Sequence, residues 1–276
     1  MKKLIFGIIG NPISHSLSPI IHNYWFKKYE INAQYNLFNI KEDEIKNTIS
    51  KIKNKEIQGI NVTLPYKKSV IPYLSKTIND AKDTHSVNTI FLDKEENLIG
   101  ENTDVFGFQA GYLEALSDEV KKNKKALVIG AGGVAPSIIL ALNKSNINNV
   151  SLVNRTYEKS LFLKRKFENL QIIKWENLLN EIKNFDIVIN ATSLGLTGGE
   201  NFNLKLPDIK KKLLYIDTIY NPAQTQMILN FKEKKIKTYN GLNMLIYQAQ
   251  KSFYLWNKVN PEVDDILINL LETNLQ

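Results

Sequence analysis

One glycine-rich segment constrains the fold more than any other part of the chain. It follows the apolar run Ala126–Ile129, precedes a helical pattern at Ser137–Asn143, and reads Gly130-Ala131-Gly132-Gly133-Val134-Ala135. An unbroken apolar run is typical of a strand that is covered on both faces. A turn of this kind between a strand and a helix binds a dinucleotide pyrophosphate, because glycine permits a tight turn and a close backbone approach. The alternative is a tight turn without a ligand.

The elements after this segment favour the dinucleotide interpretation. Strand and helix patterns alternate, and the expected strands are Val150–Val153, Gln171–Ile173, Asp186–Asn190 and Leu213–Asp217. Helical patterns at Tyr157–Phe167 and Gln224–Phe231 separate several of these strands. This order predicts a doubly wound Rossmann domain with a parallel sheet.

The first part of the chain shows a similar α/β rhythm. Strands are expected at Leu4–Ile9, Gln34–Asn39, Gln58–Val62 and Val87–Leu92, with helices at Pro19–Tyr29 and Glu42–Lys53. The tail is helical over Leu242–Trp256 and Pro261–Leu271, and we expect it to return and pack on the first domain. We therefore predict one domain from residues 1–103, completed by 240–276, and a second domain from residues 104–239.

Composition excludes several classes of protein. The chain has no cysteine, which rules out disulfides and thiolate metal sites, and no two of its three histidines have the helical spacing of a zinc site. No apolar run reaches membrane-spanning length, and the short N-terminal run is a strand pattern without a cleavage site, so we expect a cytoplasmic protein. The charge of +8 comes from lysines in polar segments, which favours a solvated surface over nucleic-acid binding.

The end of the second expected Rossmann strand indicates which dinucleotide binds. NAD enzymes usually have an acidic residue there, but this chain reads Asn154-Arg155-Thr156, with Lys159 nearby. Arginine occurs at only two positions, Arg155 and Arg165. A guanidinium can hold a 2′-phosphate through paired hydrogen bonds, so the segment favours NADP over NAD. The alternative is an ordinary surface arginine.

Two motifs of the first domain carry hydroxyl and amine groups. Ser16 and Ser18 lie two residues apart, and in an extended segment both hydroxyls would point the same way, as suits a carboxylate. The alternative for Ser18 is capping of the next helix. Lys67 follows Thr63 and Pro65, and we expect it in the first turn of a helix, where the helix dipole disfavours a lysine. That position indicates a local reason for the lysine. The alternative is an ordinary solvated lysine.

Two further motifs carry an amide and a carboxylate. Asn88 lies at the start of an expected strand in Val87-Asn88-Thr89. Asp104 lies where a helix is expected to begin, in Gly100-Glu101-Asn102-Thr103-Asp104-Val105-Phe106-Gly107. Capping of that helix is the alternative role for Asp104.

Together these motifs resemble the shikimate dehydrogenase family. The resemblance runs from Gly10 to Trp256 in the family's order and includes Asn190-Ala191-Thr192-Ser193-Leu194-Gly195 and the C-terminal pattern Gly241-x-x-Met244-Leu245-x-x-Gln248. It implies an N-terminal α/β substrate domain, a Rossmann NADP domain and a cleft between them. The implied reaction is the reversible NADPH-dependent reduction of 3-dehydroshikimate to shikimate in aromatic amino acid (chorismate) biosynthesis.

The resemblance also implies roles for individual residues. The catalytic pair would be Lys67 and Asp104, and the residues around the substrate would be Ser16, Ser18, Thr63, Asn88, Tyr220 and Gln248. The residues that hold NADP would be Gly130, Ala131, Gly132, Gly133, Val134, Asn154, Arg155, Thr156 and Lys159. Near the nicotinamide it implies Thr192, Ser193, Ile219 and Gly241. The implied partners are the small-molecule substrate and, at most, a second copy of the chain, with no metal, membrane or nucleic acid.

The sequence departs from the family pattern at two places. His85-Ser86 stands where the family often has Gly-Ala, and we expect this change to alter backbone packing and not chemistry. The usual small residue and glycine before the last strand are replaced within Phe231–Lys235.

Two other functions remain open from sequence. An NAD-dependent quinate/shikimate dehydrogenase is the closer alternative, although the serine pair and Arg155 count against it. A non-catalytic NADP-binding or nucleic-acid-associated protein is the second, suggested by the basic charge, and the Lys67–Asp104 pair counts against it.

Overall fold

The computed structural model describes residues 2–116, 121, 123–200, 202, 204–209 and 212–275. The chain forms two compact units, the first up to Gly107 together with Ile246–Asn274 and the second over Phe108–Leu245. Both changes of unit fall inside helices, α4 (Asp104–Phe108) and α10 (Leu242–Asn257). The limits 103/104 and 239/240 stay predictions, and each lies a few residues before a change of unit. The charge run at 121–125 lies partly outside the described residues.

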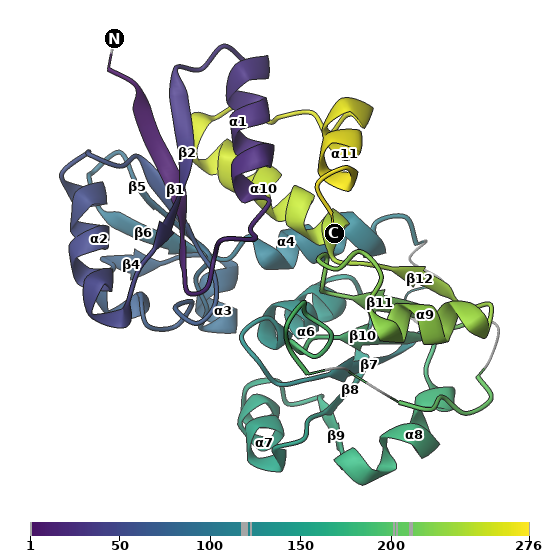
Figure 1. The fold of residues 1–276 in the computed structure, drawn as a ribbon. Coiled ribbons are helices and arrows are strands. Elements are labelled where there is room, and N and C mark those ends of the chain that lie inside the picture. The colour runs from purple at the N-terminus through teal and green to yellow at the C-terminus, as the bar shows by residue number, and fades with distance from the viewer. Residues whose placement is uncertain are drawn as a thin grey trace. The chain divides into compact units, whose positions relative to one another are not determined.

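The first unit is built on a six-stranded mixed sheet (Figure 1). The strand order is β2-β1-β3-β5-β6-β4, from β1 (Leu4–Gly10), β2 (Ala33–Asn39), β3 (Gly59–Val62), β4 (Lys76–Thr77), β5 (Thr89–Leu92) and β6 (Leu98–Glu101). Strand β1 is parallel to β2 and β3, and β4 is parallel to β6, whereas β5 is antiparallel to β3 and β6. The side chain of Asp93 accepts hydrogen bonds from the N–H groups of Glu95 and Asn97 and so closes a tight turn between β5 and β6. Such a short connection can join only antiparallel strands.

Helices cover both faces of this sheet. The helices of the unit are α1 (Ser18–Lys28), α2 (Ile45–Lys53), α3 (Asp80–Thr84), α4, α10 and α11 (Asp265–Glu272). Ile45, Ile49 and Ile52 of α2 share a helix face and pack in one core cluster with the sheet. On the other face the ring of Phe6 lies 5.2 Å from the rings of Phe26 in α1 and of Trp256 in α10. The C-terminal helices therefore complete the first unit, as the sequence predicts.

The second unit is a Rossmann fold (Figure 1). Its order is β12-β11-β10-β7-β8-β9, from β7 (Lys125–Ile129), β8 (Asn149–Val153), β9 (Gln171–Ile173), β10 (Ile187–Asn190), β11 (Leu214–Asp217) and β12 (Lys237–Tyr239). All its pairings are parallel. The helices are α6 (Ala135–Lys144), α7 (Tyr157–Lys166), α8 (Leu178–Glu181) and α9 (Gln226–Glu233). The strand order reverses between β7 and β10, and ligands of such sheets bind at the carboxyl ends of the strands beside this point.

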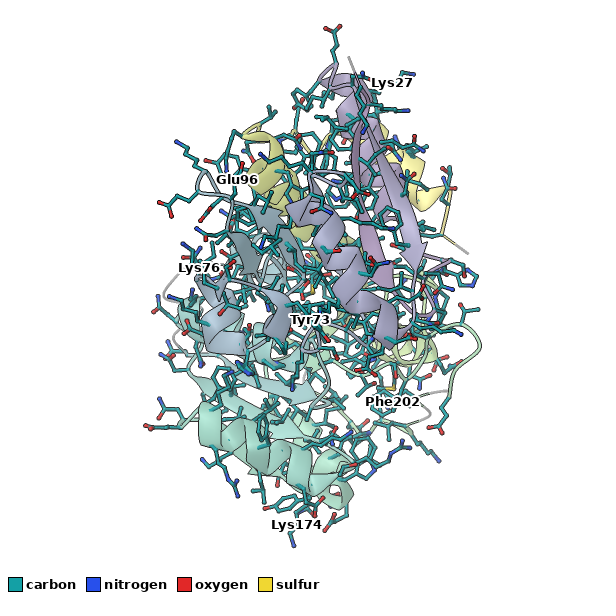
Figure 2. The ribbon with its side chains drawn as sticks, turned by 90° about the vertical axis from the view of Figure 1, so that its left-hand side faces the viewer. Lys27, Tyr73, Lys76, Glu96, Lys174 and Phe202 are labelled. Atoms are coloured by element: carbon teal, nitrogen blue, oxygen red, sulfur yellow. The ribbon has the colours of Figure 1, made fainter. Side chains whose placement is uncertain are left out.

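Charged side chains lie on the surface of both units. The lysines labelled in Figure 2, at positions 27, 76 and 174, are all exposed. The labelled Phe202 is instead buried in the core of the second unit, where its ring lies 6.2 Å from that of Trp175. In the described part of the chain, the helices are too short or too polar to cross a lipid bilayer.

Candidate active site

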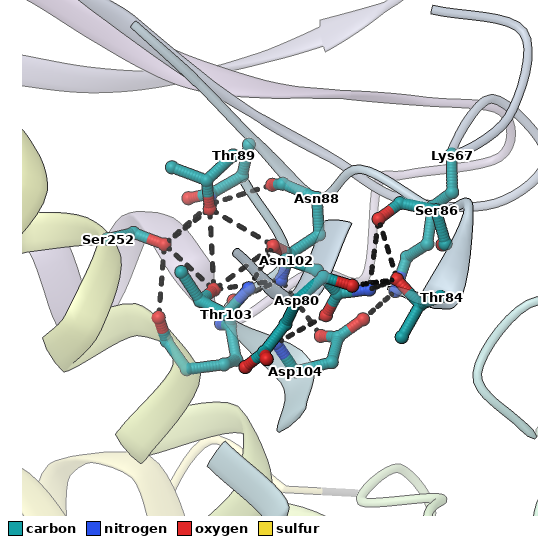
Figure 3. A network of polar contacts seen from close by, with 12 residues as sticks. Lys67, Asp80, Thr84, Ser86, Asn88, Thr89, Asn102, Thr103, Asp104 and Ser252 are labelled. Atoms are coloured by element: carbon teal, nitrogen blue, oxygen red, sulfur yellow. Dashed lines mark hydrogen bonds and ion pairs between the residues drawn. The ribbon is translucent and has the colours of Figure 1, made fainter. Parts of the chain in front are cut away.

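A lysine and an aspartate from two separate motifs form an ion pair in the first unit. The Nζ atom of Lys67 lies 2.6 Å from Oδ2 of Asp104 (Figure 3). The two side chains are 12% and 7% exposed, so water screens their interaction less than it would at the surface. An amine and a carboxylate at this distance can hold and transfer a proton.

Lys67 is held by a turn and not by a helix. The segment from Leu64 to Val70 consists of turns, followed by a short 3-10 helix at Ile71–Tyr73, so the expected helix after Pro65 is wrong. The carbonyl of Lys67 accepts a hydrogen bond from the Val87 N–H at 2.8 Å, and this contact takes it out of a helical ladder. Because Lys67 is not in the first turn of a helix, no helix dipole disfavours a lysine at this position.

Asp104 begins helix α4, as predicted, but a neighbour caps the helix. Its N–H donates to Oδ1 of Asn102 at 3.0 Å. The carboxylate of Asp104 instead accepts from Lys67 at Oδ2 and from Nδ2 of Asn88 at Oδ1, the latter at 2.9 Å. The carboxylate thus serves the ion pair, while Asn102 does the work that the capping alternative gave to Asp104.

Asn88 joins the pair to the C-terminal helix. Its Nδ2 atom lies 3.3 Å from Oε1 of Gln248, a residue of α10. Four of the sequence-predicted residues, Lys67, Asp104, Asn88 and Gln248, are therefore connected by hydrogen bonds.

The two serines lie in a different local geometry from the one expected. Leu17 between them is in the right-handed helical region, so the segment is not extended and the same-side argument is wrong. Oγ of Ser16 accepts from the N–H of Ser18 at 3.3 Å, and Ser18 is buried as the first residue of α1. Ser18 therefore does not cap α1 through its side chain.

Thr63 follows β3 at the same edge of the sheet as the loop after β1 that carries Ser16. Its N–H donates to the carbonyl of Ile9 at 2.9 Å, and the N–H of Asn11 donates to the carbonyl of Leu64 at 3.1 Å. Because β1 and β3 are parallel neighbours, the loops that follow them emerge side by side. The serine and lysine motifs thus begin at adjacent strand ends.

The glycine turn of the second unit has the shape expected for a phosphate-binding loop. Gly130 has φ +108°, and a Cβ atom there would lie 2.5 Å from Cγ2 of Thr192. The Ala131 N–H donates to Oδ1 of Asn154 at 3.0 Å, which ties the turn to the end of β8. Helix α6 starts directly afterwards with a proline in its first turn and no side-chain cap. Such a helix N-terminus presents N–H groups to an anion.

Arg155 follows β8 and reaches an open pocket of about 420 Å³ in the second unit. The pocket is lined by Arg155, Ser193, Leu194, Leu196, Thr197, Gly198, Gly199 and Glu200. The guanidinium Nη1 lies 3.2 Å from Oε2 of Glu200, and the two side chains are 69% and 72% exposed. Thr156 and Lys159, the other residues predicted here, are also exposed. No sequence motif marks Glu200, which lies in a loop.

The predicted nicotinamide-side residues lie at the carboxyl ends of β10 and β11. Oδ1 of Asn190 accepts from the N–H and the hydroxyl of Thr192, at 3.0 and 2.7 Å. Oδ1 of Asp217 accepts from Nδ2 of Asn190 and from the N–H of Ile219, at 3.0 and 3.1 Å. Burial raises the pKa of Asp217. Neither Asn190 nor Asp217 was predicted as a site residue, although polar residues that end two buried strands are a usable signal.

Gly241 and Tyr220 belong to the same part of the second unit. The Gly241 N–H donates to the carbonyl of Ile219 at 2.8 Å, and the backbone of Thr218 leaves no room for a side chain at Gly241. Tyr220 comes directly after Ile219 and is half-buried.

Two family models match the chain. The shikimate dehydrogenase substrate binding domain matches residues 8–90, and shikimate / quinate 5-dehydrogenase matches residues 114–234. A shikimate dehydrogenase (NADP(+)) from Pelagibacter ubique (strain HTCC1062) is 47% identical over 272 residues, which cover 99% of this chain and 100% of that protein.

Solved structures agree over nearly the whole chain. Shikimate 5-dehydrogenase from Listeria monocytogenes, in complex with shikimate and NAD, is 29% identical with a TM-score of 0.86, and the match covers 98% of this chain and 96% of that one. The enzyme from Thermus thermophilus, in complex with NADP(H) and shikimate, is 27% identical with a TM-score of 0.84 over 98% of each chain. On these matches, and on the motifs placed above, this chain belongs to the shikimate dehydrogenase family.

Proposed function

We propose that this chain catalyses the reversible NADPH-dependent reduction of 3-dehydroshikimate to shikimate, a step of aromatic amino acid (chorismate) biosynthesis. The observation that carries the proposal is the largely buried Lys67–Asp104 pair, 2.6 Å apart and bonded to Asn88. Membership of the family makes the chain an oxidoreductase, and a relative of 47% identity is named for NADP(+). A cytoplasmic location and a monomeric or homodimeric state remain predictions.

Lys67 and Asp104 divide the proton chemistry. When bound, NADPH would supply the hydride that reduces the C3 carbonyl carbon. The ammonium of Lys67 donates a hydrogen bond to the carbonyl oxygen, stabilises the negative charge that develops there, and delivers the proton that completes the hydroxyl. Asp104 orients the ammonium and accepts from a substrate hydroxyl. In the reverse direction the pair takes the proton back.

The remaining first-unit residues bind the substrate in this proposal. Ser16 and Ser18 receive the carboxylate, while Thr63, Asn88 and Gln248 meet the ring hydroxyls. Support comes from the hydrogen bonds that link Asn88 to Asp104 and to Gln248. Tyr220 is proposed as a further substrate contact.

The second unit offers groups that fit NADP. Gly130 makes the tight turn with φ +108°, a Cβ at Gly132 would meet nothing closer than 3.8 Å, and the N-terminus of α6 has no side-chain cap. The N–H groups of Gly130 and Ala131 donate to the carbonyl of Val153 and to Oδ1 of Asn154, so these two residues would shape the turn. The proposed pyrophosphate contacts are the backbone N–H groups of residues 132–134. Arg155, with Asn154, Thr156 and Lys159, would hold the 2′-phosphate, and the exposed guanidinium supports this assignment. Thr192, Ser193, Ile219 and Gly241 would border the nicotinamide.

A quinate/shikimate dehydrogenase that uses NAD is the second candidate. One of the matching family models covers both substrates by its description, and the Listeria relative was solved with NAD. The retained serine pair and Arg155 favour shikimate and NADP.

The deciding experiment follows the absorbance of NADPH as it reacts with 3-dehydroshikimate. The same assay is then repeated with NADH in place of NADPH. The reverse reaction is measured with shikimate and quinate, each with NADP and NAD. Turnover that is fastest with shikimate and NADP supports the proposal, and equal or faster turnover of quinate with NAD supports the second candidate. No oxidation of NADPH would leave a non-catalytic NADP-binding protein, and RNA binding that weakens with salt would point to the nucleic-acid alternative.

A further inference from the structure

A group of buried polar residues lies behind the Lys67–Asp104 pair in the first unit. Its members are Asn61, Asn88, Thr89, Thr103 and Ser252, all almost fully buried. Figure 3 shows most of these side chains converging from β5, from the segment before α4, and from α10. Burying polar groups is costly unless each is hydrogen-bonded, and every member of this group has partners.

The hydrogen bonds determine which way the Asn88 amide points. The backbone N–H of Thr103 can only donate, and it lies 2.7 Å from one amide atom of Asn88, which must therefore be Oδ1. The hydroxyls of Thr89 and Thr103 lie 3.1 Å from the same oxygen. The amide NH₂ must then face the other way, where it donates to Oδ1 of Asp104 at 2.9 Å. That bond leaves Oδ2 of Asp104 for Lys67.

Ser252 connects this arrangement to α10. Its hydroxyl donates to the backbone carbonyl of Gln248 at 3.0 Å and accepts from Nδ2 of Asn61 at 2.9 Å. Its oxygen also lies 2.8 Å from Oγ1 of Thr89 and 3.2 Å from Oγ1 of Thr103.

The number of available protons limits which acceptors the hydroxyls of Thr89 and Thr103 can serve. Because the serine proton goes to a carbonyl, each threonine hydroxyl has one proton for three acceptors: Oγ of Ser252, Oδ1 of Asn88 and, at 3.3 Å, Oγ1 of the other threonine. Ser252 and Asn88 both receive a threonine proton when one threonine donates to Ser252 and the other to Asn88. The serine oxygen thus sets where one threonine proton goes and leaves the other for Asn88.

We infer that Ser252 is a positioning residue for the reaction. It acts through Thr89 and Thr103 on the Asn88 amide, and through that amide on the carboxylate that holds Lys67. The inference rests on the proposed function, since it takes Lys67 and Asp104 as the reacting pair. Removal of the hydroxyl frees the threonine proton that Ser252 accepts and breaks one contact between α10 and Thr103, the residue before Asp104.

The test compares turnover in variants that remove one buried hydroxyl each. Ser252→Ala and the nearly isosteric Thr89→Val should each lower kcat about tenfold while KM for shikimate changes less than about threefold, because the lost alignment acts mainly on the reacting groups. Thr89→Ser keeps the hydroxyl and should restore most of kcat. The double variant Ser252→Ala/Thr89→Val should lose little more than either single variant, because both interrupt one network.

Ser160→Ala is the matched control, because Ser160 is a buried helical serine whose hydroxyl has no partner among the described residues. Turnover is expressed per folded molecule, with thermal melting as the measure of folding. Wild-type kcat in folded Ser252→Ala and Thr89→Val would overturn the inference, even if both melt earlier. If Ser252→Ala does not fold, the Thr89→Val and Thr89→Ser pair decides.

A parallel Lys67→Ala variant distinguishes failure of the proposed function from failure of the role proposed for Ser252. Normal turnover in Lys67→Ala would remove the proposed function itself. Loss of turnover in Lys67→Ala, together with kcat in Ser252→Ala and Thr89→Val equal to that of Ser160→Ala, would remove only the role of Ser252.

Discussion

The guanidinium of Arg155 and the carboxylate of Glu200 form an ion pair, with Nη1 and Oε2 3.2 Å apart. Both side chains are mostly exposed, so the pair adds little to stability. Its effect on an incoming anion is larger than its effect on the fold, because Glu200 places a negative charge beside the group proposed to hold the 2′-phosphate. Glu200 should therefore weaken the binding of NADP.

Glu200→Gln is expected to raise the affinity for 2′,5′-ADP. Unit charges about 5–10 Å apart in water interact by roughly 0.4–0.8 kcal/mol, so the expected gain is about two- to fivefold at low salt. Calorimetric titration measures it, with Glu158→Gln, another exposed glutamate of this unit, as control. An equal gain for 5′-AMP, which lacks the 2′-phosphate, would contradict the account.

Arg155→Ala should raise KM for NADPH by about tenfold or more, since it removes a bidentate donor to phosphate, and should change KM for NADH much less. The matched control is Arg165→Ala, which removes the only other arginine, an exposed residue of α7. Steady-state kinetics with each coenzyme measure the ratio. Equal changes in KM for NADPH and NADH would indicate that Arg155 is an ordinary surface residue that does not bind the 2′-phosphate.

Substitution of two glycines of the turn, Gly130 and Gly132, should have different effects. Gly130→Ala should destabilise the protein by about 1–3 kcal/mol, because its positive φ and the contact with Thr192 reject a side chain. Gly132→Ala should leave the melting temperature nearly unchanged, since its Cβ would meet nothing closer than 3.8 Å, but should weaken NADP binding where the backbone must approach the pyrophosphate. Chemical denaturation and titration of NADP on both variants check the pair. Normal NADP affinity in Gly132→Ala would place the pyrophosphate elsewhere.

His22 should make the fold sensitive to acid. The ring stacks on Tyr35 with centroids 4.3 Å apart, and neither ring nitrogen has a partner among the described residues. Burial lowers the pKa of His22 from 6.5 to about 3, with the side chain of Asn61 opposing the shift. Between these values the unfolded chain binds a proton that the folded chain does not, so stability falls as the pH falls, by about 1.4 kcal/mol per pH unit for one proton.

His22→Phe should remove this part of the pH dependence between about pH 6 and 4, because phenylalanine does not titrate. Denaturant unfolding at several pH values measures the slope. His15→Gln, a change at an exposed histidine, should keep the wild-type slope. The same slope in wild type and His22→Phe would show that His22 is not the titrating group.

The sequence predicts most elements that rest on a strong local pattern. The continuous apolar runs of β7 and β10, the glycine turn at Gly130 and the start of α4 at Asp104 are all confirmed. Short elements with weak patterns were not predicted, among them β4 with two residues, β6 and β12. A strand of two or three polar residues is formed by its neighbours, and a periodicity cannot indicate it.

Sequence motifs predicted which residues form the site. They could not predict local conformations that depend on contacts between distant parts of the chain. Lys67 lies in a turn because Val87 takes its carbonyl hydrogen bond, a contact across 20 positions that no local rule contains. In the sequence, Ser252 cannot be distinguished from other polar residues of an amphipathic helix. Its role depends on the packing of α10 on the sheet, which buries its side chain.

The two departures from the family pattern also have a structural explanation. His85 and Lys235 both have positive φ, 52° and 57°. His85 stands where the family often has glycine, and Lys235 lies in the segment Phe231–Lys235 that replaces the family's small residue and glycine. The backbone thus keeps a left-handed conformation at both places, at a strain of about 1 kcal/mol or more for each non-glycine residue. The expectation that His85 alters backbone packing and not chemistry stays a prediction.

The most direct test of the central claim is the turnover of Lys67→Ala with 3-dehydroshikimate and NADPH. If the amine beside Asp104 stabilises and protonates the developing oxyanion, kcat should fall by about 10²-fold or more while KM changes modestly. A variant that folds and turns over at nearly the wild-type rate would contradict the account, because the reaction would then not depend on the Lys67–Asp104 pair.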